Sequence, residues 1–152
     1  TALLARFFGT PEHHWIWQDP ELRFRLAELF HAIPERDLTL LLQKRKLLLL
    51  FSDARMSCAF HQFSGREVVL VFPDLLQLLR SARFALAQAV LAHEFGHVIL
   101  GHSRSAIEDL QAQLEADVYA RKIGLGKELA RVLAGFPASE EITTRLEALN
   151  DR

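Results

Sequence analysis

The sequence predicts an α+β fold, in which helices flank a small sheet that lies near the middle of the chain. Three observations predict it. Apolar residues recur at helical spacing between residues 20 and 33, the run Val68 to Phe72 has the strongest strand pattern, and the apolar stretch from Phe84 to Leu100 is long enough for a helix. Strands gathered in one part of the chain and helices elsewhere are typical of α+β domains.

The composition is that of an ordinary globular protein. The 152 residues are 50% hydrophobic and 24% charged, so we expect one domain over residues 1–152 with a core that needs no disulfide. The net charge of -1 gives no reason to expect a nucleic-acid partner. Cys58 is the only cysteine, and a small buried apolar residue is a better interpretation of it than a catalytic thiol.

No segment has the pattern of a membrane span. The run Leu47 to Phe51 is far shorter than the roughly 20 residues that a bilayer needs, and the longer run from Phe84 is interrupted by His93, Glu94 and His97. We therefore expect a soluble protein, with a cytoplasmic location favoured. The chain starts at Thr1 without a methionine, which is typical of an excised domain or a processed form.

The first third of the chain contains one clear helix. Asp19 is a good N-cap and Pro20 suits the first turn, so a helix is predicted from there to the break at Pro34. The segment before it contains Trp15 and Trp17, which would share one face if it were a strand. His13 and His14 are expected to lie in a loop.

The middle of the chain predicts a β-hairpin. The segments 56–63 and 66–72 flank a turn at Ser64-Gly65, and Pro73 ends the second strand. The preceding segment 38–51, with its many leucines, is compatible with either a helix or a strand.

The rest of the chain is predicted to be helical. A break near Ser81 separates a short helix from a long one that ends at Gly101. A further helix is expected over 105–123, with Ser105 and Glu108 as a capping box, and two shorter ones near 127–134 and 139–149.

The stretch VLAHEFGHVILGH, residues 90–102, carries the chemistry. His93 and His97 are four apart, so on a helix both imidazoles lie on one face, as two ligands of a tetrahedral zinc do. Glu94 can then act as a general base on a water molecule, and Gly96 suits a close approach by another segment. Ordinary core histidines are the alternative, but burying these groups without compensation would cost several kcal/mol.

A third ligand is expected from the helix over 105–123, which should run back antiparallel. Its central acids are Glu115 and Asp117, whose side chains diverge by about 160° on a helix and cannot face one metal equally. His102 follows His97 by five residues. A helix-end histidine interacting with the helix dipole is the favoured interpretation of it, and a metal ligand is the alternative.

These stretches together resemble the gluzincin metallopeptidases of the CAAX prenyl protease and HtpX type. The likeness covers about residues 55–125 and includes Cys58-Ala59-Phe60, Val68 to Leu76, Val90 to His102 and Glu115-Ala116-Asp117. It implies a zincin-like fold, in which the HExxH helix packs on a small sheet or hairpin and further helices follow. The compact ImmA/IrrE-type regulatory proteases show a similar pattern.

This chain departs from the family pattern at one position of the metal site. The family's zinc-binding glutamate lies four residues before the aspartate, where this chain has Gln113, and an amide is a poorer zinc ligand than a carboxylate. Glu115 is therefore predicted as the third ligand beside His93 and His97, with Asp117 as the next candidate. By the family pattern, Asp117 would instead support a histidine.

The predicted function is a zinc-dependent endopeptidase in which Glu94 transfers the proton of the attacking water. Its substrate would be an extended polypeptide added to the sheet edge near 67–72, with His61 or Tyr119 as a candidate oxyanion donor. The alternative is a catalytically weak or inactive regulatory or binding module derived from a protease, which the presence of Gln113 motivates. The sequence does not indicate an oligomeric state.

Overall fold

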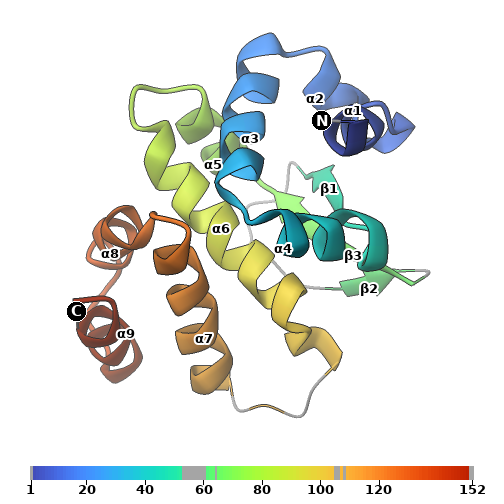
Figure 1. The fold of residues 1–152 in the computed structure, drawn as a ribbon. Helices are drawn as coiled ribbons and strands as arrows, with labels where there is room; N and C mark the ends of the chain where they lie inside the picture. The colour runs from blue at the N-terminus through green and yellow to red at the C-terminus, as the bar shows by residue number, and fades with distance from the viewer. Residues whose placement is uncertain (1, 53–60, 64, 105–106, 108, 151–152) are drawn as a thin grey trace. The chain divides into compact units, whose positions relative to one another are not determined.

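The computed structural model describes residues 2–52, 61–63, 65–104, 107 and 109–150. The chain forms two compact units, unit 1 over Thr1–Phe84 and unit 2 over Ala85–Arg152 (Figure 1). The elements combine many helices with one small sheet, as the predicted α+β class requires. The organisation as a single domain stays a prediction.

Unit 1 begins with short helical elements and a longer helix. These are α1 (Ala2–Phe8), η1 (Pro11–His13), α2 (His14–Trp17) and α3 (Pro20–Ala32). The Asp19 carboxylate caps α3 by accepting a hydrogen bond from the Leu22 N–H at 3.0 Å, so the predicted helix start is confirmed. Trp15 and Trp17 lie in a helix rather than in a strand, and Trp17 is 49% exposed beneath the guanidinium of Arg23.

His13 is buried instead of lying in an exposed loop. Its Nδ1 lies 2.7 Å from the Phe7 carbonyl oxygen, and its Nε2 accepts a hydrogen bond from the Leu49 N–H at 3.1 Å. Because a carbonyl oxygen can only accept, the proton of the neutral ring is on Nδ1. His13 therefore joins α1 to the first strand of the sheet.

The leucine-rich segment contains both kinds of structure that its sequence allows. It forms α4 (Glu35–Thr39), a π-helical turn η2 (Leu40–Lys44) and then strand β1 (Leu48–Phe51). Leu41 and Leu49 are fully buried, so both parts of the segment contribute to the core of unit 1.

The sheet of unit 1 has three strands in the order β1-β3-β2. Strand β3 (Arg66–Val71) pairs in parallel with β1 and antiparallel with β2 (His61–Phe63). The hairpin is thereby confirmed where it is described, whereas Ser64 of its turn and Cys58-Ala59-Phe60 lie outside the described residues. The prediction that 67–72 offers an exposed edge is wrong, because β3 is the central strand and is paired on both sides.

The predicted helix break near Ser81 is confirmed. Helix α5 (Pro73–Leu79) begins at the proline that ends β3, and α6 (Phe84–Leu100) follows the break. The Ser81 hydroxyl donates to the Leu78 carbonyl and accepts from the Arg83 N–H, which satisfies backbone groups between the two helices. Gly101 ends α6 with a φ of 74°, as expected of a glycine at a helix C-terminus.

Unit 2 continues with the turn η3 (His102–Arg104), α7 (Asp109–Lys122), α8 (Gly126–Leu133) and α9 (Glu140–Asn150). Helix α7 begins four residues later than predicted, and Ser105 and Glu108 of the predicted capping box lie outside the described residues. The two short C-terminal helices are confirmed within a residue of their predicted ends.

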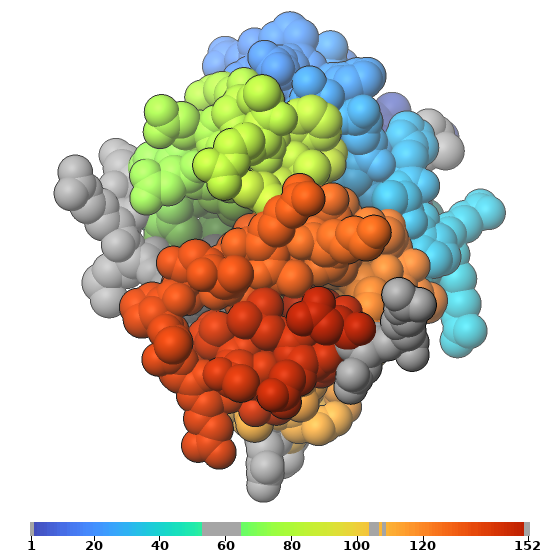
Figure 2. Space-filling model, turned by 90° about the vertical axis from the view of Figure 1, so that its left-hand side faces the viewer, coloured from blue at the N-terminus to red at the C-terminus, as the bar shows by residue number. Residues whose placement is uncertain are grey.

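Within unit 2, α7 runs back along α6 in the opposite sense, and α8 and α9 pack against α7 (Figure 1). In the space-filling view, α8 and α9, coloured orange to red, form a continuous surface (Figure 2). Ala116 and Ala120 of α7 and Leu129 of α8 are buried in this packing. Within the described residues, no helix is both long and apolar enough to cross a bilayer.

Candidate metal centre

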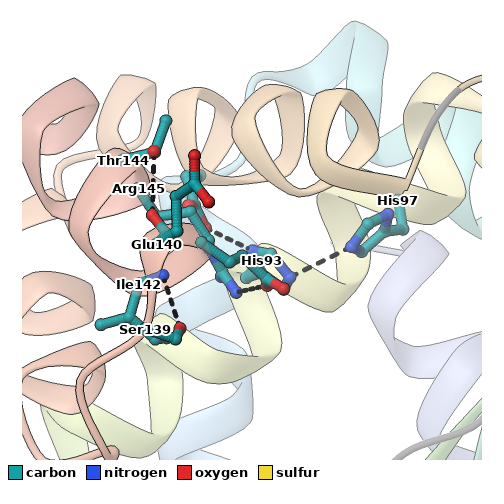
Figure 3. A network of polar contacts seen from close by, with 9 residues as sticks. His93, His97, Ser139, Glu140, Ile142, Thr144 and Arg145 are labelled. Atoms are coloured by element: carbon teal, nitrogen blue, oxygen red, sulfur yellow. Dashed lines mark hydrogen bonds and ion pairs between the residues drawn. The ribbon is translucent and has the colours of Figure 1, made fainter.

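Helix α6 brings His93 and His97 together in the interior of unit 2. The two rings lie one helical turn apart, and their Nε2 atoms are 3.0 Å from each other (Figure 3). The ring planes are nearly perpendicular, at 84°, with centroids 4.7 Å apart. His93 is only 7% exposed. The predicted convergence of the two imidazoles is therefore present.

Helix α7 approaches α6 closely at Gly96, between the two histidines. A Cβ atom at Gly96 would lie 3.1 Å from the Tyr119 Cβ and 3.2 Å from the Ala116 Cα. Both distances are tighter than ordinary contact, so only glycine allows the backbones to come this near. The close approach that Gly96 suggested is thus made by α7, and it brings the polar face of α7 to the two imidazoles.

Asp117 of α7 lies directly behind His93. Its Oδ1 is 2.7 Å from the His93 Nδ1, and the aspartate side chain is fully buried. Burial alone would raise the pKa of Asp117, but its bonds to His93 and to Arg145 outweigh burial and lower it. An ionised carboxylate only accepts hydrogen bonds, so the His93 proton is on Nδ1 and the Nε2 lone pair is available.

Arg145 of α9 holds the other side of Asp117. Its Nε donates to Oδ2 at 2.8 Å and its Nη2 donates to Oδ1 at 2.9 Å, and Arg145 is itself buried. The sequence interpretation missed this residue. Its signal was the helical spacing that places Arg145 between Ile142 and Leu149, on the apolar face of a helix, where a charge needs a partner.

His97 has polar partners on its opposite ring nitrogen. Its Nδ1 lies 2.8 Å from the Nδ1 of His102, whose Nε2 lies 3.0 Å from the Glu115 Oε2. The other oxygen of Glu115 accepts a hydrogen bond from Gln111 at 3.0 Å. Bonds from Gln111 and His102 lower the pKa of Glu115, so this carboxylate is ionised.

The environment of His97 favours the neutral ring. Burial, together with the neighbouring His93 and His102, lowers the pKa of His97 to about 3, against the opposing effect of a hydrogen bond with Gln113. Neutral imidazole is the form that binds a metal ion. The charge state of His97 at neutral pH therefore suits a ligand.

Gln113 occupies the position where the family pattern has a carboxylate. It lies four residues before Asp117 on α7, so both side chains project from one face, Gln113 to His97 and Asp117 to His93. Among the described residues, no three His, Cys, Asp or Glu side chains converge as a ready metal site. The two imidazoles fit a metal ion. The position from which the family pattern supplies the third ligand is occupied by the amide of Gln113.

Glu94 lies beside His93 on α6 and is partly buried. Burial raises the pKa of Glu94, while electrostatic interactions with His93 and Arg145 oppose that shift. Of the two candidate oxyanion donors, Tyr119 is buried beside Gly96, and the side chain of His61 lies outside the described part of the chain.

Helix α6 carries His93, Glu94 and His97, and a carboxylate from the next helix lies behind the first histidine. This arrangement is typical of metallopeptidases. Residues 40–145 match the model of Peptidase family M48, and the chain belongs to that family. Comparison with curated proteins and with solved structures finds no match. The family supports a metallopeptidase type of function, with polypeptides as substrates.

Proposed function

We propose that this protein is a zinc-dependent endopeptidase, related within its family to the CAAX prenyl protease and HtpX type. The observation that carries the proposal is the pair of Nε2 atoms of His93 and His97, 3.0 Å apart, on the helix that also carries Glu94. Two neutral imidazoles that face each other this closely are suited to sharing one divalent cation. A zincin-like fold is part of the proposal.

His93 and His97 would hold the metal through Nε2. Bound zinc would supply Lewis acidity, which polarises a scissile carbonyl and makes a water molecule more acidic. Asp117 keeps the His93 ring in the tautomer that leaves Nε2 free, and Arg145 keeps Asp117 in place. The chain would thus offer two oriented nitrogen ligands before any metal is bound.

Glu94 would act as the proton carrier. Its carboxylate takes the proton of the attacking water and then delivers it to the leaving amine. A pKa raised by burial supports this role, because a carboxyl group must hold the proton between the two steps. Glu94 needs no direct contact with the metal for either step.

The identity of the third protein ligand distinguishes the proposed peptidase from the alternative, an inactive regulatory module. The role predicted for Glu115 requires its carboxylate to exchange the contacts with His102 and Gln111 for the metal, and this ligand role stays a prediction. Gln113 already bonds to His97 from the position where the family pattern has an acid. An amide there favours weaker metal binding than a carboxylate would.

The alternative is a catalytically weak or inactive regulatory module that keeps the family fold. Gln113 is the observation that favours it, because this residue leaves a site with two histidines and an amide. Metal content and turnover distinguish the two functions: the module would bind metal weakly and would not cleave polypeptides, with or without a chelator.

The test compares the purified protein with its Glu94→Gln variant. We expect zinc to bind both, and the wild type alone to cleave an unfolded protein substrate in a chelator-sensitive manner. Glu147→Gln, an exposed change of the same kind on α9, is the matched control and should cleave normally. Full activity in Glu94→Gln would refute the role of Glu94, and a wild type that binds zinc but cleaves nothing would support the module.

A further inference from the structure

The two candidate ligand histidines are supported in different ways. His93 touches a buried carboxylate directly, through Nδ1 and Asp117. His97 instead touches the imidazole of His102, and His102 in turn touches the carboxylate of Glu115. Both arrangements link a candidate ligand histidine to a carboxylate. In the second, the ring of His102 lies between them.

The direction of each hydrogen bond in this series follows from its acidic end. The Glu115 carboxylate can only accept, so the His102 Nε2 donates to it at 3.0 Å. In a neutral His102 the Nδ1 is then an acceptor, and the ring nitrogen that faces it, Nδ1 of His97, must donate at 2.8 Å. The proton of His97 is therefore on Nδ1, and its Nε2 carries a lone pair.

The same tautomer results on both histidines. Asp117 leaves a lone pair on the His93 Nε2, and the series through His102 leaves one on the His97 Nε2. These two atoms are 3.0 Å apart, near the roughly 3.3 Å expected of two nitrogens on one tetrahedral zinc. Two lone pairs at this distance repel unless a cation lies between them.

Helix geometry explains why a second ring is needed. Glu115 and Asp117 are two residues apart on α7, so their side chains diverge by about 160° and cannot both touch the α6 histidines directly. His102, in the turn η3 after α6, reaches the side of α7 that carries Glu115. The His102 side chain is only 7% exposed, which a histidine that merely ended a helix in solvent would not need.

We propose that His102 and Glu115 are positioning residues that act through His97, fixing the tautomer and orientation in which its Nε2 binds the metal. The inference rests on the proposed metal site but not on peptide cleavage. It gives each histidine of the HExxH motif a carboxylate from α7, Asp117 directly for His93 and Glu115 through His102 for His97.

The test measures zinc affinity by competition with a chromogenic chelator, and the absorption spectrum of the cobalt-substituted protein. We expect His102→Phe and Glu115→Gln each to weaken zinc binding by about 10-fold or more, the usual effect of losing an outer-sphere partner. The double variant should bind no more weakly than the weaker single variant, because both changes interrupt one series. The cobalt bands should stay in place, since the ligands themselves are unchanged.

His102→Gln provides a rescue, because its amide oxygen can accept the proton of His97 Nδ1, and it should recover part of the affinity lost in His102→Phe. Exposed changes of the same residue types, His31→Gln and Glu147→Gln, are the controls and should bind zinc like the wild type. Circular dichroism of each metal-free variant verifies that it is folded.

Three outcomes would overturn the inference. Zinc affinity within about two-fold of wild type in His102→Phe would rule out the positioning role, because losing an outer-sphere partner usually weakens metal binding by about 10-fold or more. A shifted cobalt spectrum in Glu115→Gln alone, with His102→Phe unchanged, would make Glu115 a direct ligand. A wild type that binds no divalent metal would remove the metal site and the inference together, whereas metal binding without peptide cleavage would remove only the peptidase.

Discussion

Arg145 and Asp117 form a buried, two-pronged ion pair that joins α9 to α7 behind the candidate ligand His93. The two hydrogen bonds are 2.8 Å and 2.9 Å long, and the residues are 28 positions apart in the chain. Asp117 is fully buried, so the pair is shielded from water and salt. Helix α9 therefore holds a residue that positions Asp117 in the candidate metal centre.

Replacing Arg145 by methionine is expected to destabilise the protein by about 3–5 kcal/mol, because it leaves Asp117 buried without its cation. Chemical denaturation measures the change. Arg145→Lys keeps the charge but loses the two-pronged geometry, so it should be destabilised less. Adding Asp117→Asn to Arg145→Met should recover part of the loss, and a double variant less stable than Arg145→Met would contradict the explanation.

Gly96→Ala is expected to lower the free energy of unfolding, although alanine is the better helix former by about 1 kcal/mol. The added methyl would meet the Ala116 Cα at 3.2 Å and the Ala116 carbonyl oxygen at 3.3 Å, and these backbone atoms cannot rotate away. Overpacking of this kind costs about 1–3 kcal/mol, so a net loss of about 1 kcal/mol should appear in thermal denaturation. Increased stability would show that α7 can move aside freely.

Gln113→Glu is expected to strengthen zinc binding. It places a carboxylate beside His97, where the amide now bonds, and carboxylates are the better zinc ligands. An affinity gain of at least about 10-fold is expected, since changes outside the ligand shell already reach that size. Competition with a chelator measures it, with Gln18→Glu in an exposed part of unit 1 as the control. If Gln113→Glu and the wild type bind zinc equally well, the third ligand does not come from position 113.

The pH dependence of stability in unit 1 should depend in part on His13. Burial lowers the pKa of His13 from 6.5, while the bond to the Phe7 carbonyl opposes the shift. The unfolded chain then binds the proton more readily than the folded one. The contribution of His13 to stability is complete above about pH 6.5 and is lost as the pH falls toward the lower, folded-state pKa.

Thermal denaturation between pH 7 and pH 5 tests this expectation. His13→Phe should show a smaller loss of stability on acidification than the wild type does. At neutral pH the variant should be less stable by about 1–3 kcal/mol, because the Leu49 N–H loses its acceptor. The exposed His31→Gln variant should follow the wild-type profile, and an unchanged profile in His13→Phe would assign the pH effect to another group.

The sequence by itself determined the features that depend on near neighbours in the chain. The cap at Asp19, the break near Ser81 and the glycine end of α6 follow from local hydrogen bonding and backbone preference. The pairing of His93 with His97 follows from the helical repeat, because residues four apart share a face whatever surrounds the helix. The HExxH spacing therefore identified the two candidate ligands and the candidate base.

Only the tertiary structure decided which groups meet these histidines. Several acids lie on α7, and the sequence could not say that Asp117 backs His93 while Glu115 turns to His102. That outcome depends on the closeness with which α7 crosses α6 at Gly96 and on the insertion of Arg145 from α9. Such contacts join residues far apart in the chain, and their free energy comes from burial and charge pairing that no local pattern records.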